Sequence, residues 1–584
     1  MPNWLNKLAS IFTYKESVSD HEGFELLENH TEGRENSQPA SDNTAKRYVE
    51  KKKSAGIKAP MKVKEWNEAK KEERAGTVEA QGKYINVSLQ LNIERMRQEF
   101  NIPVNCDLII REFILSNGIK ACIAFIEGMT DKQVVNNFIL RQLMWPESFN
   151  SYQGTDISGY IVDKVLSVND IKKSKEFKKI ISEVLNGRTA LFVDGSEECI
   201  LVETKGYEKR NVDKPVTESV VRGSQEGFTE NLRTNITLIR KIIRNKNLMT
   251  EILPMGKTNH LNCAVLYMDG IADPVLIKEV KRRIKSIDAD FIMGDGMLEQ
   301  FIEDSPFRIF PQVINTERPD RAASFLMEGQ VVIVTDGTPF ALAMPVTFFR
   351  LFHTSEDSNV RWQFGTVIRF VRILGLLSAT FLPGLYLALI LYHQEMLPTD
   401  LLASIAIAKE NVPFPTLVEV LLMELSFELI REAGIRVPGI IGTTLGIIGA
   451  LILGQAAVAA NIVSPILIIV VAITGLGNFA IPNYSLATGV RILRFFFILF
   501  GAMAGFYGMS AAIFIVGCIA CSMKSFGVPF FSPIAPKLKT NPDVLIRQPI
   551  WKQKMRTDYL NTPNRKRQGD QPRGWVEKRG KERQ

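Results

Sequence analysis

The sequence has few of the residues that most often carry catalysis or hold metals. Its 584 residues include only five histidines and six cysteines. It contains no Gly-rich phosphate loop, no zinc-type Cys/His spacing and no Ser-His-Asp or Cys-His arrangement. Gly294-Asp295-Gly296 lacks the strand–turn–helix context that a nucleotide site requires. We therefore predict a protein that is not an enzyme, with no catalytic, cofactor-binding or metal-binding residue.

A secretory leader is also missing from residues 1–20, which have no continuous apolar core and no cleavage site. We therefore expect the polar region that follows to stay in the cytoplasm. Disulfides are not expected in that compartment, although the region holds Cys106, Cys122, Cys199 and Cys263. Cys518 and Cys521 lie in an apolar segment, where packing is a better interpretation than redox or metal chemistry.

Charged residues are scarce between residues 438 and 523, the stretch around which the rest of the chain is organised. A helix of roughly 20 apolar residues crosses about 30 Å of hydrocarbon. Four segments meet this requirement, the last being long enough to tilt: 373–393, 438–457, 462–481 and 492–523. We assign 361–524 to a transmembrane domain and 525–584 to a basic tail, since residues 537–584 hold 14 Lys/Arg against 5 Asp/Glu. The positive-inside rule places this tail in the cytoplasm, and no nucleic-acid partner is predicted.

An internal repeat organises the polar part of the chain. ACIAFIEGMTDKQV at 121–134 aligns with CAVLYMDGIADPVL at 263–276, and GRTALFVDG at 187–195 aligns with GQVVIVTDG at 329–337. Both pairs have the same offset of 142 residues, which predicts two homologous lobes. The fold class is therefore α/β plus membrane α-helical: two duplicated cytoplasmic α/β lobes precede a polytopic helical domain.

The predicted boundaries follow from this repeat. They are a flexible charged arm at 1–82, lobe 1 at 83–206, a helical connecting segment at 207–249, and lobe 2 with its junction at 250–360. Asn117-Gly118 between two apolar runs predicts a hairpin, and Thr130 is expected to cap a helix that runs to Met144. A ligand cleft and a simple assembly platform both remain open for the lobes. Four acidic turns are interpreted as turn chemistry rather than catalysis: Glu127-Gly128, Asp194-Gly195, Asp269-Gly270 and Asp336-Gly337.

An acidic helix is expected at 414–433, with a capping box formed by Thr416 and Glu419 and a stop at Gly434. So many acids make a poor membrane span, so the helix should lie at the outer interface or pack against its neighbours. Two interpretations stay open. The acids could form a cation-attracting vestibule in a ring of subunits, or pairs such as Glu428–Arg431 and Glu432–Arg436 could simply stabilise the helix. The vestibule candidates are Glu419, Glu424, Glu428 and Glu432.

The segment 438–457 is the best candidate for a pore-lining helix because it is rich in small and hydroxyl residues. Gly442-x-x-x-Gly446 allows close approach of a neighbouring helix. The candidate pore-lining residues of this segment and the turn after it are Gly442, Thr443, Gly446, Gly449, Gln455 and Asn461.

Several motifs resemble the A subunit of GerA-type spore germinant receptors. They are MELSFELIREAGIRVPGIIG at 423–442, LILGQAAVAANIVSP at 451–465, SMKSFGVPFFSP at 522–533, FPQVINTERPDRAA at 310–323, DGTPFALAMP at 336–345, HQEMLPTDLL at 393–402 and EGFTENLRTNITLIR at 226–240. The resemblance covers roughly residues 105–536 and does not extend to the arm or the basic tail.

This resemblance implies a receptor subunit in the inner membrane of a bacterial spore. It implies a multi-span, nutrient-binding B subunit and a lipoprotein C subunit as partners, self-association into a ring in membrane lipid, and a ligand-gated cation channel. It implies no catalytic residues. The alternatives are a non-conducting scaffold that clusters germinant-binding subunits and, last, a transporter, for which no inverted repeat is seen in the apolar region.

Overall fold

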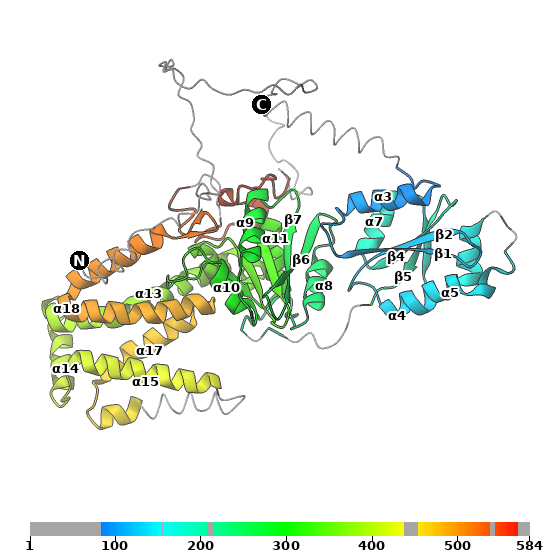
Figure 1. Cartoon of the computed structure of the whole chain (residues 1–584). Helices are drawn as coiled ribbons and strands as arrows, with labels where there is room; N and C mark the ends of the chain where they lie inside the picture. Colours follow the sequence, from blue (N-terminus) through cyan, green and yellow to red (C-terminus); the bar gives the residue numbers. More distant parts are fainter. Residues whose placement is uncertain are drawn as a thin grey trace, which may run out of the picture. The chain divides into compact units, whose positions relative to one another are not determined.

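The computed structural model describes residues 83–569 apart from 153, 155, 207–213, 216, 437–453 and 538–542. The predicted arm at 1–82 and most of the predicted crossing at 438–457 lie outside the described residues. The described chain forms two compact units (Figure 1). One unit is lobe 1, residues 83–103 and 107–206. The other combines lobe 2, the helical region Trp362–Ser522 and the tail segment 523–569.

Lobe 1 is a five-stranded antiparallel sheet with the strand order β1-β2-β4-β5-β3. Side chains alternate between the two faces of a strand, and both faces of β2 are buried. Cys122 and Ala124 face α3 and α7, whereas Ile123 and Phe125 face the helical segments between residues 132 and 165 (Figure 1). Its elements are α3 (Leu89–Glu99), β1 (Leu108–Ile114), β2 (Lys120–Ile126), α4 (Lys132–Val134), η1 (Val135–Leu140), α5 (Arg141–Met144), η2 (Pro146–Phe149), α6 (Ile157–Tyr160), η3 (Ile161–Val165), β3 (Ile171–Ser174), α7 (Phe177–Leu185), β4 (Arg188–Val193) and β5 (Cys199–Glu203).

Lobe 2 repeats this topology with the strand order β6-β7-β9-β10-β8. The aligned sequence repeats fall on corresponding strands, β2 with β7 and β4 with β9. Helices α8 and α11 pack on one face of the sheet, and α9 and α10 pack on the other. Its elements are α8 (Leu232–Ile242), β6 (Leu248–Met255), β7 (Leu261–Met268), α9 (Pro274–Lys285), α10 (Asp295–Ile302), β8 (Ile314–Thr316), α11 (Pro319–Glu328), β9 (Val331–Thr335) and β10 (Ala341–Met344).

The repeat extends to individual hydrogen bonds. In lobe 1 the Asp194 carboxylate accepts from the backbone N–H of Leu89 at the start of α3, at 3.0 Å. In lobe 2 the Asp336 carboxylate accepts from Leu232 N–H at the start of α8, at 3.1 Å. Helix α8 is therefore the counterpart of α3 and belongs to lobe 2, whereas the sequence boundary had given it to the connecting segment 207–249.

Two local predictions have different outcomes. The hairpin at Asn117-Gly118 is confirmed, because β1 and β2 pair antiparallel with Ile114 opposite Lys120. The cap at Thr130 is wrong. Asp131 is the N-cap residue, and its carboxylate accepts from Gln133 N–H at 2.8 Å. The Thr130 hydroxyl instead donates to the carbonyl of Ile126 at 3.2 Å. The carboxylate of Asp131, the next residue in sequence, therefore supplies the acceptor for the orphan amides.

Loss of the Asp336 carboxylate is expected to lower the stability of the protein by a small, measurable amount. Asp336→Ala removes the acceptor at the start of α8 and is expected to destabilise the protein by roughly 0.5–2 kcal/mol, the usual range for a lost helix cap. Asp269→Ala is the matched control, since Asp269 is an exposed residue of another acidic turn. Chemical unfolding of the full chain measures both. Equal effects of the two variants would contradict the capping role.

The described part of the helical region contains two helices long and apolar enough to cross a membrane, α13 (Trp362–Tyr392) and α18 (Tyr484–Ser522), and the shorter apolar helix α17 (Pro465–Phe479). The predicted segment 373–393 falls largely within α13, and 462–481 contains α17. Helices α14 (Thr399–Lys409) and α15 (Thr416–Arg436) come between α13 and the residues left undescribed. The acidic helix predicted at 414–433 is thus α15, and it continues through Gly434 to Arg436 rather than stopping there.

The predicted single crossing at 492–523 differs from the structure, because α18 breaks at Ala504 and Gly505. Gly505 has φ 57° and ψ −135°, outside the helical range. A Cβ placed on Gly508 would overlap the carbonyl oxygen of Phe500, so these two residues lie in direct contact. In a straight helix these residues would be about 12 Å apart. The two halves, 484–503 and 506–522, therefore fold back on each other, and the second half returns toward lobe 2.

The tail segment is a structural part of lobe 2. Several of its residues are buried in the lobe core, among them Phe526, Val528, Tyr559 and Leu560. The Ser525 hydroxyl donates to the Gln312 carbonyl at 2.6 Å and accepts from Val346 N–H at 3.0 Å. Two short elements, η4 (Phe348–Phe352) and α12 (Ser355–Asn359), lie between lobe 2 and α13, and η5 (Gln394–Met396) follows α13. The tail segment contains β11 (Lys524–Ser525), β12 (Val528–Pro529), η6 (Ile550–Lys552) and η7 (Asp558–Leu560).

Candidate functional site

Helix α15 packs inside the helical region despite its acids. Phe427 of α15 lies against Gly475 of α17, where a Cβ would meet its ring at 2.5 Å. The Glu419 carboxylate accepts from Ser464 N–H, just before α17, at 3.1 Å. These contacts run in the same order along both helices, so α15 and α17 are parallel. The helix therefore packs against its neighbours, one of the two placements that the sequence allowed.

Two arginines from the first half of α18 pair with the acids of α15. Arg494 approaches Glu424 with an N–O distance of 3.0 Å, and Arg491 approaches Glu428 with 2.8 Å. The Glu424 side chain is fully buried and that of Arg494 is 2 % exposed. Glu428 also pairs with Arg431 on its own helix, as predicted. The network thus joins two helices through a buried pair, Glu424–Arg494, and a pair whose acid, Glu428, is 28 % exposed.

This network is incompletely satisfied. Among the described residues, neither carboxylate oxygen of Glu424 has a hydrogen-bond partner of good geometry, and the same holds for Nε and Nη2 of Arg494. Charges removed from water without full hydrogen bonding are expensive. Buried ionisable groups in a membrane helix are accordingly a functional-site hypothesis by default.

The other predicted vestibule acids lie apart from this network. Glu419 is buried near the start of α15, 3.6 Å from Lys409 Nζ. Thr416 Oγ1 accepts from the same ammonium group, so Thr416 and Glu419 bind Lys409 rather than forming a capping box. Glu432 is exposed. The structure therefore separates the four acids into two buried clusters and one surface residue, and the vestibule stays a prediction.

The predicted pore-lining residues are only partly described. Gly442, Thr443, Gly446 and Gly449 lie outside the described residues. Gln455, in the helical residues 454–459, and Asn461, in the turn before α17, are described, and both are exposed. The sequence interpretation missed Arg491 and Arg494. The available signal was two arginines three residues apart at the start of an otherwise apolar segment.

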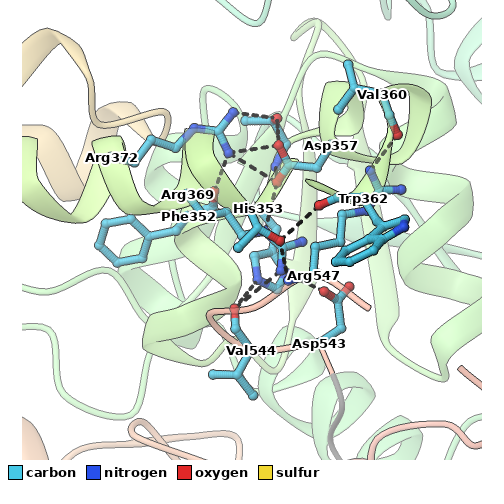
Figure 2. Close-up of polar contacts among 12 residues, drawn as sticks. Phe352, His353, Asp357, Val360, Trp362, Arg369, Arg372, Asp543, Val544 and Arg547 are labelled. Atoms are coloured by element: carbon cyan, nitrogen blue, oxygen red, sulfur yellow. Dashed lines mark hydrogen bonds and ion pairs between the residues drawn. The ribbon is translucent and has the colours of Figure 1, made fainter. Parts of the chain in front are cut away.

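A second charged cluster lies where lobe 2 meets α13 (Figure 2). Asp357 of α12 is 3 % exposed and accepts from two arginines of α13. Arg369 Nε donates to it at 3.2 Å, and Arg372 Nη1 donates at 3.0 and 3.1 Å. Arg369 also donates to Asp543 of the tail segment at 2.6 Å. We call these residues, with His353 and Arg547, the junction cluster.

The tail segment completes the junction cluster. Arg547 Nη1 donates to the carbonyl of Val360 at 2.8 Å, and His353 Nε2 lies 3.0 Å from the carbonyl of Val544 (Figure 2). Burial, and then the nearby charges of Arg369 and Arg350, lower the pKa of His353 well below its usual value. The ring is therefore neutral at pH 7, and Nε2 donates to Val544. The cluster joins lobe 2, α13 and the tail through polar contacts.

Comparison with known proteins places this architecture in a family. Residues 94–559 match the family model described as Bacillus/Clostridium GerA spore germination protein. Spore germination protein KA of Bacillus subtilis (strain 168) is 39% identical over 492 residues, covering 84% of this chain and 90% of that protein. Spore germination protein GerLA of Bacillus cereus is 38% identical over 472 residues, covering 80% and 95%.

Two further similarities carry less functional detail. The uncharacterized membrane protein YfkQ of Bacillus subtilis (strain 168) is 37% identical, covering 81% of this chain and 91% of that protein. The crystal structure of the N-terminal domain of the A subunit of the Bacillus megaterium spore germinant receptor GerK3 matches with 29% identity and a TM-score of 0.37, covering 45% of this chain and 97% of that one. On the family match and the full-length relatives, the chain belongs to the Bacillus/Clostridium GerA family of spore germination proteins and is a germination receptor subunit of that family.

Proposed function

We propose that the chain is the A-type subunit of a nutrient receptor in the spore inner membrane and that it forms a ligand-gated cation channel. In this proposal it assembles into a ring with a multi-span, nutrient-binding B subunit and a lipoprotein C subunit. The lobes and the tail are cytoplasmic. The direction of the helices supports lobe 2 and the tail lying on one side of the membrane, because α13 starts at lobe 2 and the second half of α18 returns to it.

The buried ion pairs between α15 and α18 are the observation that carries the proposal. A carboxylate that is 0% exposed and incompletely hydrogen-bonded, such as Glu424, is poorly suited to a purely structural role. A second conformation that separates α15 from α18 would release the acids toward a cation path. The residues that follow α15 include Gly442 and Gly446, so a shift of α15 would move the proposed pore helix as well.

The junction cluster supplies a route from the lobes to the membrane. A nutrient bound to a partner shifts the subunit toward the state it binds better. Asp357 connects lobe 2 to two successive turns of α13, so a rotation of lobe 2 would reach α13 directly. Gating is then a change between two arrangements of the same ion pairs.

Cation flux through liposomes containing the full receptor tests this function. Gly446→Leu is expected to lower nutrient-triggered flux roughly tenfold or more by narrowing the pore, without preventing assembly. Gly517→Leu in α18 is the matched control, because a Cβ there meets no atom within 4 Å. Normal flux in the assembled Gly446→Leu receptor would remove the pore assignment.

A non-conducting scaffold is the second candidate, and the pairing of the acids with arginines favours it. In a scaffold the α15–α18 ion pairs would only hold the subunit together. Charge reversal at Glu424 and Glu428 separates the two functions. A changed cation preference supports the channel, whereas lost assembly with no change in preference supports the scaffold.

A further inference from the structure

We propose that the loop before β8, with Phe307 at its tip, inserts into the lipid headgroup boundary and anchors lobe 2 to the bilayer surface. This inference rests on the part of the proposed function that places the helical region across a membrane. The partner it requires is a lipid surface.

The helices define where this boundary lies. Arg372 is held by the lobe-2 groups Phe352 O and Asp357, and about 20 residues of α13 follow it, enough for roughly 30 Å of hydrocarbon. Gly375, one turn further, packs against Gly477 and Ala480 at the end of α17. The end of α17 and the start of α18 therefore lie level with the point where α13 becomes apolar.

Exposed aromatic side chains mark this level. Phe479, the last residue of α17, is 66% exposed, and Tyr484, the first residue of α18, is 61% exposed. Aromatic residues are enriched where membrane helices meet the headgroup region. The lobe-side boundary of the bilayer is thus defined by residues of the helical region alone.

The loop of lobe 2 reaches the same level. The carbonyl oxygen of Ile309 would lie 2.8 Å from a Cβ on Gly489, in the second turn of α18. The Phe310 ring is buried and its centroid lies 5.8 Å from that of Phe530. Phe307, three residues earlier, is 99% exposed. The loop is therefore fixed to α18 at one end, while the Phe307 side chain is left uncovered.

The charges around the loop are compatible with a lipid surface. Asp304 accepts from Arg283 and from the backbone of Phe526, both at 2.6 Å. Glu303 accepts from Gln312 N–H at 3.2 Å. These acids are therefore engaged on the lobe side rather than repelling anionic headgroups. Arg308 follows Phe307 directly, and a basic residue beside an aromatic one is typical of membrane-surface segments.

Photo-crosslinking tests the anchor in the full chain, in nanodiscs that contain phosphatidylglycerol. A benzoylphenylalanine at position 307 is expected to give a phospholipid adduct roughly tenfold more abundant than the same residue at position 291. Phe291 is a matched control, being 55% exposed and next to the Ile292 carbonyl that Asn259 binds near the β6–β7 turn, away from the tail side of the lobe. Mass spectrometry identifies each adduct.

A benzoylphenylalanine at position 514 distinguishes failure of the Phe307 anchor from failure of the proposed membrane placement. Phe514 lies on α18 in the helical region and is 72% exposed. Lipid adducts at 514 and 307 but not at 291 support the anchor. Lipid at 514 without lipid at 307, or an adduct from 307 to a second protein chain, overturns it and leaves the proposed function standing. Absence of lipid at 514 overturns the membrane placement itself, and the anchor with it.

Discussion

Arg494→Met is expected to destabilise the helical region by about 3–5 kcal/mol, the usual effect of removing one partner of a buried ion pair. The variant leaves the Glu424 carboxylate fully buried and without its arginine. Glu428 keeps Arg491, so the loss falls on Glu424. Chemical unfolding of the full chain in detergent, followed by near-UV circular dichroism, measures the change.

The double variant Arg494→Met with Glu424→Leu shows whether the uncompensated charge is the cause. Replacing both partners by apolar residues is expected to recover most of the loss, because no buried charge remains. Arg361→Met is the matched control, since Arg361 is exposed at the start of α13 and should change stability by less than about 0.5 kcal/mol. If the double variant is as unstable as Arg494→Met, the effect comes from lost packing rather than from the ion pair.

The fold of the lobes was predicted well because their strands, turns and internal repeat can be recognised in the sequence. The apolar run that forms β2, the Asn117-Gly118 turn and the 142-residue repeat can all be seen within the sequence itself. The two strand orders, β1-β2-β4-β5-β3 and β6-β7-β9-β10-β8, have the arrangement that a duplication predicts. The acidic turns also fit, because Asp194 and Asp336 bind the first amides of α3 and α8.

The charge networks were harder to predict because their partners are distant in sequence. Glu428 and Arg491 are separated by 63 positions, and Arg369 and Asp543 by 174. Near the acids of α15 the sequence offered only Arg431 and Arg436 as partners, so the pairs with Arg491 and Arg494 were not predicted. Gly505 did not predict a sharp turn either, since glycine is common in apolar membrane helices. Its positive φ of 57° becomes visible only in the structure.

The packing of the tail against lobe 2 was also not predicted, because it depends on contacts that are distant in sequence. Its composition predicted only a basic tail, yet Tyr559 and Leu560 are 6% and 1% exposed in the core of lobe 2. Two apolar residues among many cations give no periodicity to detect. What orders them is the surface of a lobe that lies more than 200 positions earlier, as the hydrogen bond from Arg556 to Met327 shows.

Asp357→Asn in the junction cluster is expected to destabilise the protein by about 3–5 kcal/mol, as much as Arg494→Met. The change removes the carboxylate that Arg369 and Arg372 share, while both guanidinium groups stay buried. Arg369 retains Asp543, whereas within the described part of the chain Arg372 retains the Phe352 carbonyl and the Thr354 hydroxyl alone. An amide also presents an N–H2 donor to one of these cations, which adds repulsion. Glu356→Gln on the same short helix is the matched control, expected to change stability by less than about 0.5 kcal/mol.

Measuring both stability and nutrient-triggered flux distinguishes a junction cluster that transmits motion from one that only stabilises the fold. If it transmits motion, Asp357→Asn should reduce nutrient-triggered flux in receptors that are still assembled at a temperature below unfolding. Because α13 begins within this cluster, a loosened junction lets lobe 2 move without moving the helix. A variant that is destabilised yet gates normally would assign the cluster to folding alone. The route from lobe 2 to the membrane would then have to run through the second half of α18, which returns to the lobe at Ser525.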